Sequence, residues 1–404
     1  MLVNSILIAG LVAATQVAAS PCKPPPKYKP IESIQLGPRP YWLVDDMSDS
    51  PVKKQLEECK DIKEFKPSAW SIAHRGGGTL FMPEHSVESN LAGARMGAGV
   101  LECDVAFTSD RQLVCRHSQC DLHYTTDIVT HPALNAKCTT PFAPAQDGRP
   151  ATAKCCTSDI TLAEFKTLCA RMEGANTTAT TPEAYLLGAP VWRTELYGRC
   201  GTVLTHKEHI RMTDELGLQF TPELKNPAAA YAQQLIDEYR QAGIDPRRVW
   251  PQSFHYPDIL YWLDNEPAFG AQAVYLDENG ETAATFPDAV ANLTTYKADG
   301  VRIVAPPLPY LVTLDDGGRI VPSAYATRAN ELGLEIITWS LERSGVLSDG
   351  TKGGYYYTTI ADAIQTDGDV FELLHVLAKD IGVLGVFSDW SATVTYYANC
   401  LGLF

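Results

Sequence analysis

Two carboxylates separated by a single residue, Glu102 and Asp104, are the side chains in this sequence best suited to do chemistry. One histidine precedes them along the chain and another follows, His74 and His117, and a third acidic residue, Glu223, comes later. Carboxylate oxygens are the ligands that Ca²⁺ and Mg²⁺ prefer, and imidazole groups exchange protons near neutral pH. Together, these residue types are what a metal-assisted acid–base hydrolase needs.

The stretch around Glu102 and Asp104 has the pattern of a strand with two unlike faces. Successive side chains of a strand point to opposite faces, so the two carboxylates share one face. Apolar side chains form the other face, namely Leu101, Cys103, Val105 and Phe107. Because this apolar face must be buried, we expect the carboxylates to point into a separate, polar site. Surface carboxylates on an edge strand are the alternative interpretation.

Short apolar strands alternate with amphipathic helices from Trp70 onward. Helices are expected after Ser86, which can cap one, and over residues 161–172, 228–242 and 322–332. Nine strands are expected, over residues 71–74, 100–107, 113–117, 218–223, 249–254, 273–276, 301–305, 334–340 and 382–388. Such alternation is typical of a parallel (β/α)₈ TIM barrel, which has one strand fewer.

A hairpin accounts for the ninth strand. Only residues 108–112 separate the second expected strand from the third, and a helical crossover needs more residues than that. With a turn centred between Asp110 and Arg111, His117 lies opposite Asp104, on the carboxylate face. A register shift of one residue would turn His117 to the other face. The other eight strands then form the barrel, with the site at their carboxyl ends.

A long loop rich in Pro and Thr, residues 126–157, follows the hairpin. We expect nearby cysteines to hold this loop in place, namely Cys120, Cys138, Cys155 and Cys156. The sequence holds 11 cysteines, an odd number, so at least one thiol is free or pairs between chains. We expect Cys103 to be the free one, as an inert thiol buried on the apolar face of its strand.

The beginning of the chain predicts secretion. Residues 1–19 have the apolar run and the small residues at a cleavage position that are typical of a signal peptide, and an N-terminal core helix is the alternative. Residues 20–66, rich in Pro and Lys, are expected to form an extended arm with little regular structure before residue 52. The barrel domain then spans residues 67–404.

The composition allows one large domain and argues against two classes of partner. The chain has 404 residues, 45% of them hydrophobic, which is ample for a barrel of about 250 residues. Its formal net charge of −15 argues against nucleic acid and anionic membranes as partners. A small anionic substrate is still compatible, because a local site can carry cations.

Two sequons, at Asn176 and Asn292, fit a secreted glycoprotein. The oligomeric state is left open.

The order of these residues resembles the glycerophosphodiester phosphodiesterase family. Three segments match its motifs, namely His74-Arg75-Gly76, the acidic strand over residues 97–105 and Glu223-Leu224-Lys225. Looser likenesses occur at Pro83-Glu84-His85-Ser86, at Thr125-Thr126 and over residues 252–254, 338–340 and 385–389. The resemblance covers most of the chain, from residue 70 to residue 392.

This resemblance implies a TIM barrel of the phospholipase C-like phosphodiesterase type, with an acid–base pair beside a metal. His74 and His117 would be the general acid and the general base, in one order or the other. One divalent cation, Ca²⁺ or Mg²⁺, would be held by the carboxylates of Glu102, Asp104 and Glu223.

Three further residues have implied roles toward the substrate. Arg75 and Lys225 would contact the phosphate, and Trp339 would line the pocket for the remainder of the substrate. The arrangement suits a phosphodiester, because cations offset the charge on the phosphoryl oxygens while imidazoles move protons to and from the reacting oxygens. The attacking group is water or the adjacent glycerol hydroxyl. A core position for Trp339, and a simple ion pair between Glu223 and Lys225, are the alternatives.

Two positions depart from the family pattern. Ser118 stands where the family has Asp after its second histidine, and His85 stands where it has Asn after Pro-Glu. Ser118 can form hydrogen bonds but carries no charge to orient an imidazole, which puts full activity and metal affinity in question. Glu84, beside His85, is expected to help cap the following helix.

The sequence leads to one function and leaves two alternatives. The leading one is a secreted, metal-dependent phosphodiesterase that hydrolyses glycerophosphodiesters to glycerol 3-phosphate and an alcohol such as choline. A sphingomyelinase-like or lysophospholipase D-like enzyme would share the barrel, although the sequence shows no basic amphipathic segment for binding a membrane. A catalytically silent, surface-binding barrel is the second alternative, and Ser118 is the main feature that favours it.

Overall fold

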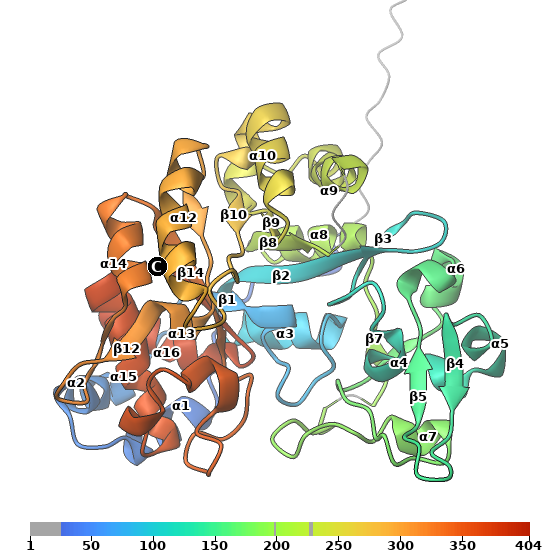
Figure 1. The fold of residues 1–404 in the computed structure, drawn as a ribbon, viewed down its shortest axis with the longest axis horizontal. Helices are drawn as coiled ribbons and strands as arrows, with labels where there is room; N and C mark the ends of the chain where they lie inside the picture. Colours follow the sequence, from blue (N-terminus) through green and yellow to red (C-terminus); the bar gives the residue numbers. More distant parts are fainter. Residues whose placement is uncertain (1–25, 198, 226–228) are drawn as a thin grey trace, which may run out of the picture.

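Eight parallel strands close into a barrel at the centre of the computed structural model, which describes residues 26–197, 199–225 and 229–404 (Figure 1). Each strand pairs with the next in the order β1, β2, β8, β9, β10, β11, β14, β15 and back to β1. Their bounds are β1 Ser68–Ala73, β2 Ala98–Phe107, β8 Gln219–Leu224, β9 Gln252–Ser253, β10 Val274–Tyr275, β11 Ile303–Val304, β14 Glu335–Leu341 and β15 Gly385–Ser388. The predicted (β/α)₈ barrel is confirmed.

Alternating side chains of the barrel strands pack into two separate cores. Inward-facing apolar side chains fill the barrel, among them Ile72, Val100, Val274, Ile303, Ile337 and Phe387. Outward-facing side chains of β2, Leu101, Cys103 and Val105, lie in a larger core that the surrounding helices complete. The predicted division of β2 into an apolar face and a carboxylate face is therefore confirmed.

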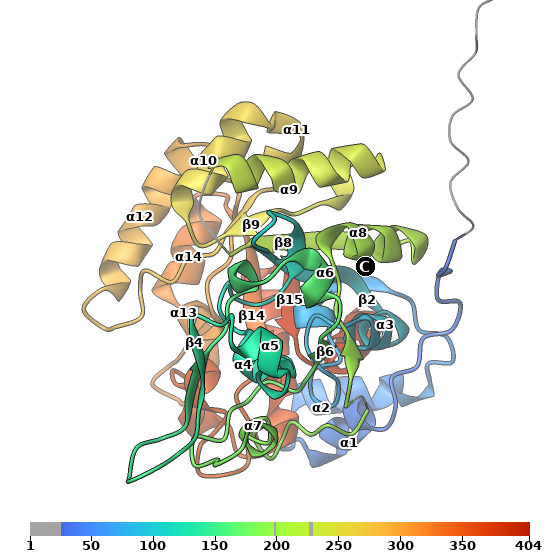
Figure 2. The ribbon, with the colours of Figure 1, turned by 90° about the vertical axis from the view of Figure 1, so that its right-hand side faces the viewer.

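Helices cover the outside of the barrel, as Figure 2 shows for α8 to α12. The covering helices are α3 Val87–Arg95, α8 His206–Glu215, α9 Ala229–Ala242, α10 Tyr256–Asn265, α11 Pro267–Gly270, α12 Phe286–Ala298, α14 Ala324–Glu331, α15 Val370–His375 and α16 Ser391–Leu401. The helix after Ser86 and those predicted over residues 228–242 and 322–332 are confirmed. A short helix and a hairpin follow β11, namely α13 Leu308–Leu311, β12 Val312–Leu314 and β13 Ile320–Pro322.

The added strand is β3, Leu113–Cys115, which pairs antiparallel with β2 as predicted. The register is wrong by one residue: Cys115 lies opposite Val105, and the Arg116 N–H donates to the carbonyl oxygen of Asp104. His117 nevertheless reaches the carboxylate side. Because β3 ends at Cys115, the alternation of strand side chains does not govern the direction of His117.

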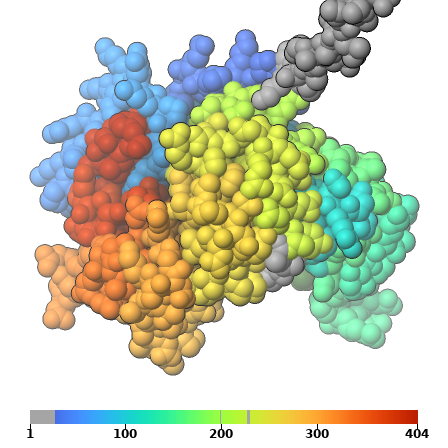
Figure 3. Space-filling model, turned by 90° about the horizontal axis from the view of Figure 1, so that it is seen from above, coloured from blue at the N-terminus to red at the C-terminus, as the bar shows by residue number. Residues whose placement is uncertain are grey.

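An insertion over residues 116–205, between β3 and α8, forms a lobe beside the barrel. Seen from above, it is the cyan and green mass next to the yellow helices (Figure 3). The lobe has its own apolar cluster, which includes Ile128, Phe165 and Tyr185. Its elements are α4 Leu122–Thr125, α5 Pro132–Asn135, β4 Thr140–Ala143, β5 Thr152–Lys154, α6 Leu162–Phe165, β6 Cys169–Ala170, α7 Pro182–Tyr185 and β7 Gly201–Thr202. The expected long loop therefore has short regular elements of its own.

The helix predicted over residues 161–172 is wrong beyond its first turn. It begins as expected, because Thr161 and Glu164 form a capping box at the start of α6. The chain then leaves the helix and enters β6, which pairs with β7, while Cys169 bonds to Cys200. Pairing with a distant segment thus overrides the local helical pattern.

The segment before the barrel folds against it. Two helices, α1 Arg39–Asp46 and α2 Pro51–Glu58, bury apolar side chains such as Leu43 and Leu56 in the main core. The expectation of little regular structure before residue 52 is therefore wrong. The apolar side chains of α1 stabilise the helix by packing against the last helices of the barrel. The predicted signal peptide, residues 1–19, lies outside the described residues.

All ten cysteines in the described part of the chain form disulfides. The pairs are Cys59–Cys400, Cys103–Cys115, Cys120–Cys156, Cys138–Cys155 and Cys169–Cys200. The predicted clamping of the long loop is confirmed. The prediction that Cys103 is free is wrong, because the shifted register makes it a diagonal neighbour of Cys115 on the outer face of the hairpin. Cys22 lies outside the described residues.

None of the described helices is long and apolar enough to cross a membrane.

Candidate active site

A cavity of about 320 Å³ opens where several barrel strands end, as the sequence predicted. Seven of the eight predicted site residues line it, namely His74, Arg75, Glu102, His117, Glu223, Lys225 and Trp339. The eighth, Asp104, is buried next to the carboxylates of Glu102 and Glu223. The structure thus brings all the predicted site residues together around one cavity.

Three carboxylates converge on one point beside the cavity. Asp104 on β2 and Glu223 on β8 are directly paired across the two parallel strands, and Glu102 lies on the same face of β2. One oxygen from each of the three side chains lies within 4.8 Å of the others, and all three residues are buried. Three oxygens at this spacing can surround a single Ca²⁺ or Mg²⁺ ion.

The negative charges of these carboxylates repel one another and shift their pKa values. Burial raises the pKa of Glu102 well above its usual value, and the charges of Asp104 and Glu223 add to the shift. Burial also raises the pKa of Glu223 to about 8, although Lys225 opposes this. Burial acts in the same direction on Asp104, but Lys225 and His85 outweigh it and bring its pKa well below the usual range. The buried Oδ1 of Asp104 has no hydrogen-bond partner. Crowded carboxylates with an unpartnered buried oxygen fit a divalent cation.

His74 directly follows β1, and its partner Asp389 directly follows β15. Because Ala73 and Ser388 are paired between these two strands, the residues after them are neighbours. His74 Nδ1 donates to Asp389 Oδ1 at 2.5 Å, which fixes the orientation of the imidazole ring and leaves Nε2 for proton transfer. Burial lowers the pKa of His74 to about 4, although Asp389 opposes the shift. Asp389 had no predicted role, and the pairing of β1 with β15 is the signal that could have found it.

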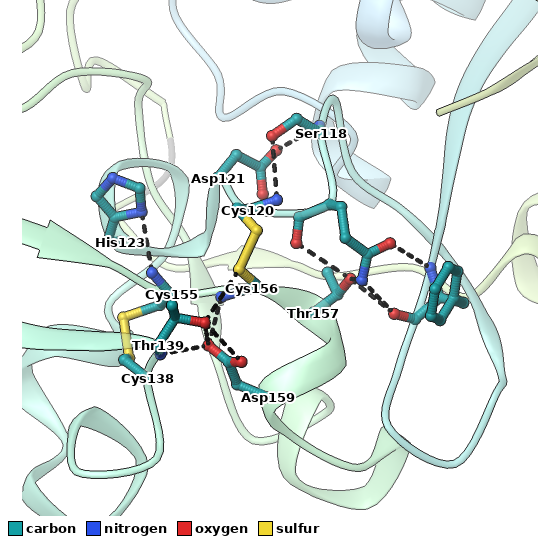
Figure 4. Close-up of a disulfide and its surroundings, with 12 residues drawn as sticks. Ser118, Cys120, Asp121, His123, Cys138, Thr139, Cys155, Cys156, Thr157 and Asp159 are labelled. Atoms are coloured by element: carbon teal, nitrogen blue, oxygen red, sulfur yellow. Dashed lines mark hydrogen bonds between the residues drawn. A yellow bond between two sulfur atoms is a disulfide. The ribbon is translucent and has the colours of Figure 1, made fainter. Parts of the chain in front are cut away.

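His117 directly precedes a turn that the insertion holds in place, and Figure 4 shows this turn from Ser118 to Asp121. The Ser118 N–H donates to Asp121 Oδ2 at 3.1 Å, and the Cys120 N–H donates to Ser118 Oγ at 3.2 Å. The Cys120–Cys156 disulfide then joins the turn to the rest of the lobe. Ser118 therefore closes the turn by hydrogen bonds, and the nearby carboxylate is that of Asp121.

A second disulfide ties the segment before His117 to β2, the strand that carries two of the three carboxylates. Cys103 lies between Glu102 and Asp104, and its partner Cys115 precedes His117 by two residues. The crosslink therefore limits the movement of the histidine relative to the two carboxylates. Burial lowers the pKa of His117 well below its usual value, and nearby cationic side chains add to the shift.

Arg75 occupies a turn directly after His74, with its backbone in the left-handed region at φ 52°. Its backbone N–H donates to Glu102 Oε2 at 2.6 Å, and its guanidinium group donates to Glu84 Oε2 at 2.8 Å. The capping role expected for Glu84 is wrong, because Ser86 alone caps α3 while Glu84 pairs with Arg75. Arg75 is therefore held at the cavity by two carboxylates.

Two residues without a predicted role support the carboxylates. His85 Nε2 donates to Asp104 Oδ2 at 2.8 Å, and Gln252 Nε2 donates to Glu102 Oε1 at 3.0 Å. Both side chains are buried. Such donors orient carboxylate ligands and leave their other oxygens available to a metal. The position of His85 in a family motif was the only sequence signal for it.

Lys225 directly follows β8 and contacts two of the three carboxylates. It forms an ion pair with Glu223, and its Nζ lies 3.8 Å from Asp104 Oδ2. The same Nζ lies 5.7 Å from the centre of the Phe254 ring. Lys225 is thus a cation at the cavity wall, between the carboxylates and an aromatic side chain.

Trp339 is part of an aromatic wall. Its ring packs edge to face against Phe254 and Tyr356, with centroid separations of 5.7 and 6.0 Å. The indole N–H donates to the carbonyl oxygen of Ala305 at 2.9 Å, which fixes the ring. Because Trp339 is half-buried and lines the cavity, it is not simply a core residue.

The chain belongs to the glycerophosphoryl diester phosphodiesterase family, whose model matches residues 74–389. A protein of Arthroderma benhamiae named only as an extracellular protein is 45% identical over 245 residues, which are 57% of this chain and all of that protein. Among solved structures, a candidate glycerophosphoryl diester phosphodiesterase from Silicibacter pomeroyi DSS-3 has a TM-score of 0.52 at 18% identity. That match covers 86% of this chain and 98% of the other, and it supports the fold.

The carboxylate trio predicts stabilisation by a divalent cation. Adding Ca²⁺ or Mg²⁺ at 100 times its dissociation constant should raise the free energy of unfolding by about 2.7 kcal/mol, seen as a higher melting temperature. Glu102→Gln and Asp104→Asn should remove this response, because each replaces a charged ligand. Glu278→Gln is the matched control, since Glu278 lines the same cavity outside the trio, and it should keep the response. An undiminished response in Glu102→Gln and Asp104→Asn would contradict the assignment of the metal site.

Asp121 predicts a pH dependence of stability. Burial raises the pKa of Asp121 to about 7, although Arg116 opposes the shift. Because the pKa is raised in the folded state, the contribution of Asp121 to the free energy of unfolding is fully present below about pH 4. This contribution is lost as the pH rises toward 7, by a total on the order of 4 kcal/mol. Asp121→Asn removes this loss, so the variant should gain stability relative to wild type between pH 4 and pH 8 in denaturant unfolding.

Asp110→Asn serves as a control of opposite sign. A hydrogen bond from the Thr108 hydroxyl lowers the pKa of Asp110, so its contribution is present above pH 4 and is lost at lower pH. If the difference in unfolding free energy between Asp121→Asn and wild type stays constant from pH 4 to pH 8, the buried carboxyl does not titrate as described.

Proposed function

We propose that this protein is a metal-dependent phosphodiesterase that hydrolyses glycerophosphodiesters to glycerol 3-phosphate and an alcohol. One observation carries the proposal: two imidazoles, three carboxylates and two cationic side chains, drawn from distant parts of the chain, meet at a single cavity. Membership of the glycerophosphoryl diester phosphodiesterase family supports the same reaction class.

His74 and His117 carry the proton transfers in this proposal. One imidazole removes a proton from the attacking oxygen, which belongs to water or to the glycerol hydroxyl beside the phosphate. The other donates a proton to the departing alkoxide, which is otherwise a poor leaving group. Positioned proton transfer of this kind accelerates reactions by roughly 10²–10⁴-fold. The lowered pKa values of the two buried histidines keep the imidazole that acts as the base neutral near pH 7, whereas the imidazole that acts as the acid has to be protonated when the anionic substrate is bound.

The cationic groups bind and orient the phosphate. Arg75 and Lys225 lie at the cavity and offset negative charge on the phosphoryl oxygens as it grows. Glu102, Asp104 and Glu223 would hold one Ca²⁺ or Mg²⁺ ion, which supplies further positive charge to the same oxygens when bound. Because Glu84 already holds Arg75 in place, little ordering of that side chain is needed when the substrate enters.

The aromatic wall favours an alcohol with a cationic head group, such as choline. Phe254, Trp339 and Tyr356 line the cavity together with the exposed carboxylate of Glu278. Aromatic faces attract ammonium groups through their quadrupoles, and a nearby carboxylate adds to this attraction. The substrate would then lie with its phosphate at Arg75 and its head group against the rings.

An extracellular location fits the chemistry of the chain. Five disulfides are stable in an oxidising compartment, and the relative from Arthroderma benhamiae is named as an extracellular protein. We infer that the protein is secreted after removal of residues 1–19.

Turnover of glycerophosphocholine with Ca²⁺ or Mg²⁺ tests the proposed reaction. Release of glycerol 3-phosphate should be readily measured in wild type and should fall by roughly 10²–10⁴-fold in His74→Ala and His117→Ala, because each loses a proton-transfer group. His131→Ala is the control, since His131 is a half-buried residue of the insertion that is not among the described residues lining the cavity, and it should retain full activity. Equally slow rates in all four proteins would instead indicate a catalytically silent barrel.

Trp339→Leu tests the head-group site. The Michaelis constant for glycerophosphocholine should rise by about tenfold, the effect of losing a cation–π contact of 1 to 2 kcal/mol. The constant for glycerophosphoglycerol, which has a neutral head group, should rise much less. Trp42→Leu alters an exposed tryptophan and should change neither constant. An equal rise for both substrates would show that the ring does not select for positive charge.

A further inference from the structure

The insertion reaches the active site through Arg193 and Glu173. Arg193 is nearly fully buried, and its Nη2 donates to Asp389 Oδ2 at 2.7 Å, on the carboxylate whose other oxygen accepts from His74. Its Nη1 donates to Glu173 Oε2 at 2.7 Å. Arg193 is not among the described residues that line the cavity, so it lies behind the histidine rather than beside the substrate.

A network of ion pairs surrounds this contact. Arg343, which follows β14, donates to Asp389 Oδ2 at 3.2 Å and is ion-paired with Glu173. On the other side, Arg75 lies 3.7 Å from Glu173 Oε1. Asp389, itself fully buried, is therefore held by one arginine from the barrel and one from the insertion, and Glu173 bridges the two. Because both arginines donate to Oδ2 of Asp389, they fix the direction in which Oδ1 meets His74.

The segment that carries these two residues is held on both sides. Cys169 and Cys200 close it with a disulfide that brackets both Glu173 and Arg193. Its backbone docks on the barrel, since the Thr194 N–H donates to the carbonyl oxygen of Leu80 at 3.0 Å. Figure 1 shows this green segment running from α7 back toward the barrel.

We propose that Arg193, with Glu173, is a positioning residue for catalysis: it acts through Asp389 to orient the His74 imidazole. The insertion is then part of the active site and not an independent module. This positioning role depends on the proposed function in one respect, namely that His74 transfers a proton. The orientation of the His74 ring can be measured separately.

Arg193→Met tests the proposal in the full-length protein. With glycerophosphocholine, whose alkoxide leaving group needs a proton, kcat should fall by roughly 10- to 100-fold while the Michaelis constant changes by less than about threefold. Arg193→Lys should restore part of kcat, since it keeps one donor to Asp389. In an Asp389→Asn background, Arg193→Met should have little further effect, because both changes break the same connection.

Arg171→Met is the matched control. Arg171 lies in the same disulfide-closed segment and forms a bidentate pair with Glu195, at 2.6 and 3.0 Å, that does not involve Asp389. It should leave kcat within about twofold of wild type. Equal losses in Arg171→Met and Arg193→Met would overturn the proposal in favour of a general structural role, as would a rise in the Michaelis constant with unchanged kcat.

Chemical modification separates this proposal from the proposed function. At pH 8, diethyl pyrocarbonate should modify His74 at least about threefold faster in Arg193→Met than in wild type or Arg171→Met, because a loosely held imidazole is more accessible. Mass spectrometry of the His74 peptide measures this rate without any turnover. If wild type cleaves no diester but His74 labelling changes as expected, the proposed function fails and the positioning role stands. Identical His74 labelling in all three proteins would overturn the positioning role.

Discussion

The mutual repulsion of three buried carboxylates is the constraint on which the rest of the site depends. Charges this close are costly where water is excluded, unless neighbouring groups offset them. Lys225, His85 and the backbone N–H of Arg75 supply part of this compensation, each at a different carboxylate. These groups come from separate strand ends and loops, so they meet only after the barrel has closed. The same crowding leaves room for a divalent cation as the remaining source of positive charge.

The insertion extends this constraint from the three carboxylates to the two histidines. On one side, a turn closed by Ser118 and tied through Cys120 holds His117. On the other, Arg193 reaches Asp389 behind His74. A plain barrel would supply the strands and the carboxylates, but here the lobe supports both of the histidines that we propose as proton-transfer groups. Disulfides gather around the lobe, because an apolar core as small as this one contributes little stability by itself.

Much of this architecture could be predicted from the sequence, because it depends on local patterns. Strand periodicity revealed the barrel, and the spacing of Glu102 and Asp104 placed them on one face of β2. The features that were missed depend on tertiary contacts. The hairpin register could not be derived because β3 ends before His117, and the Cys103–Cys115 disulfide follows from that same register. The role of Asp389 requires knowing that β1 and β15 are neighbours, which barrel closure alone determines.

Crystallographic anomalous scattering from protein soaked with Mn²⁺, as a stand-in for Mg²⁺ or Ca²⁺, tests the central claim most directly. The account predicts one strong anomalous peak bonded to oxygens of Glu102, Asp104 and Glu223, with His74 and His117 on the same cavity. Absence of a peak at these carboxylates, in crystals where Mn²⁺ is bound elsewhere or not at all, would contradict it. So would a peak that engages only one of the three side chains.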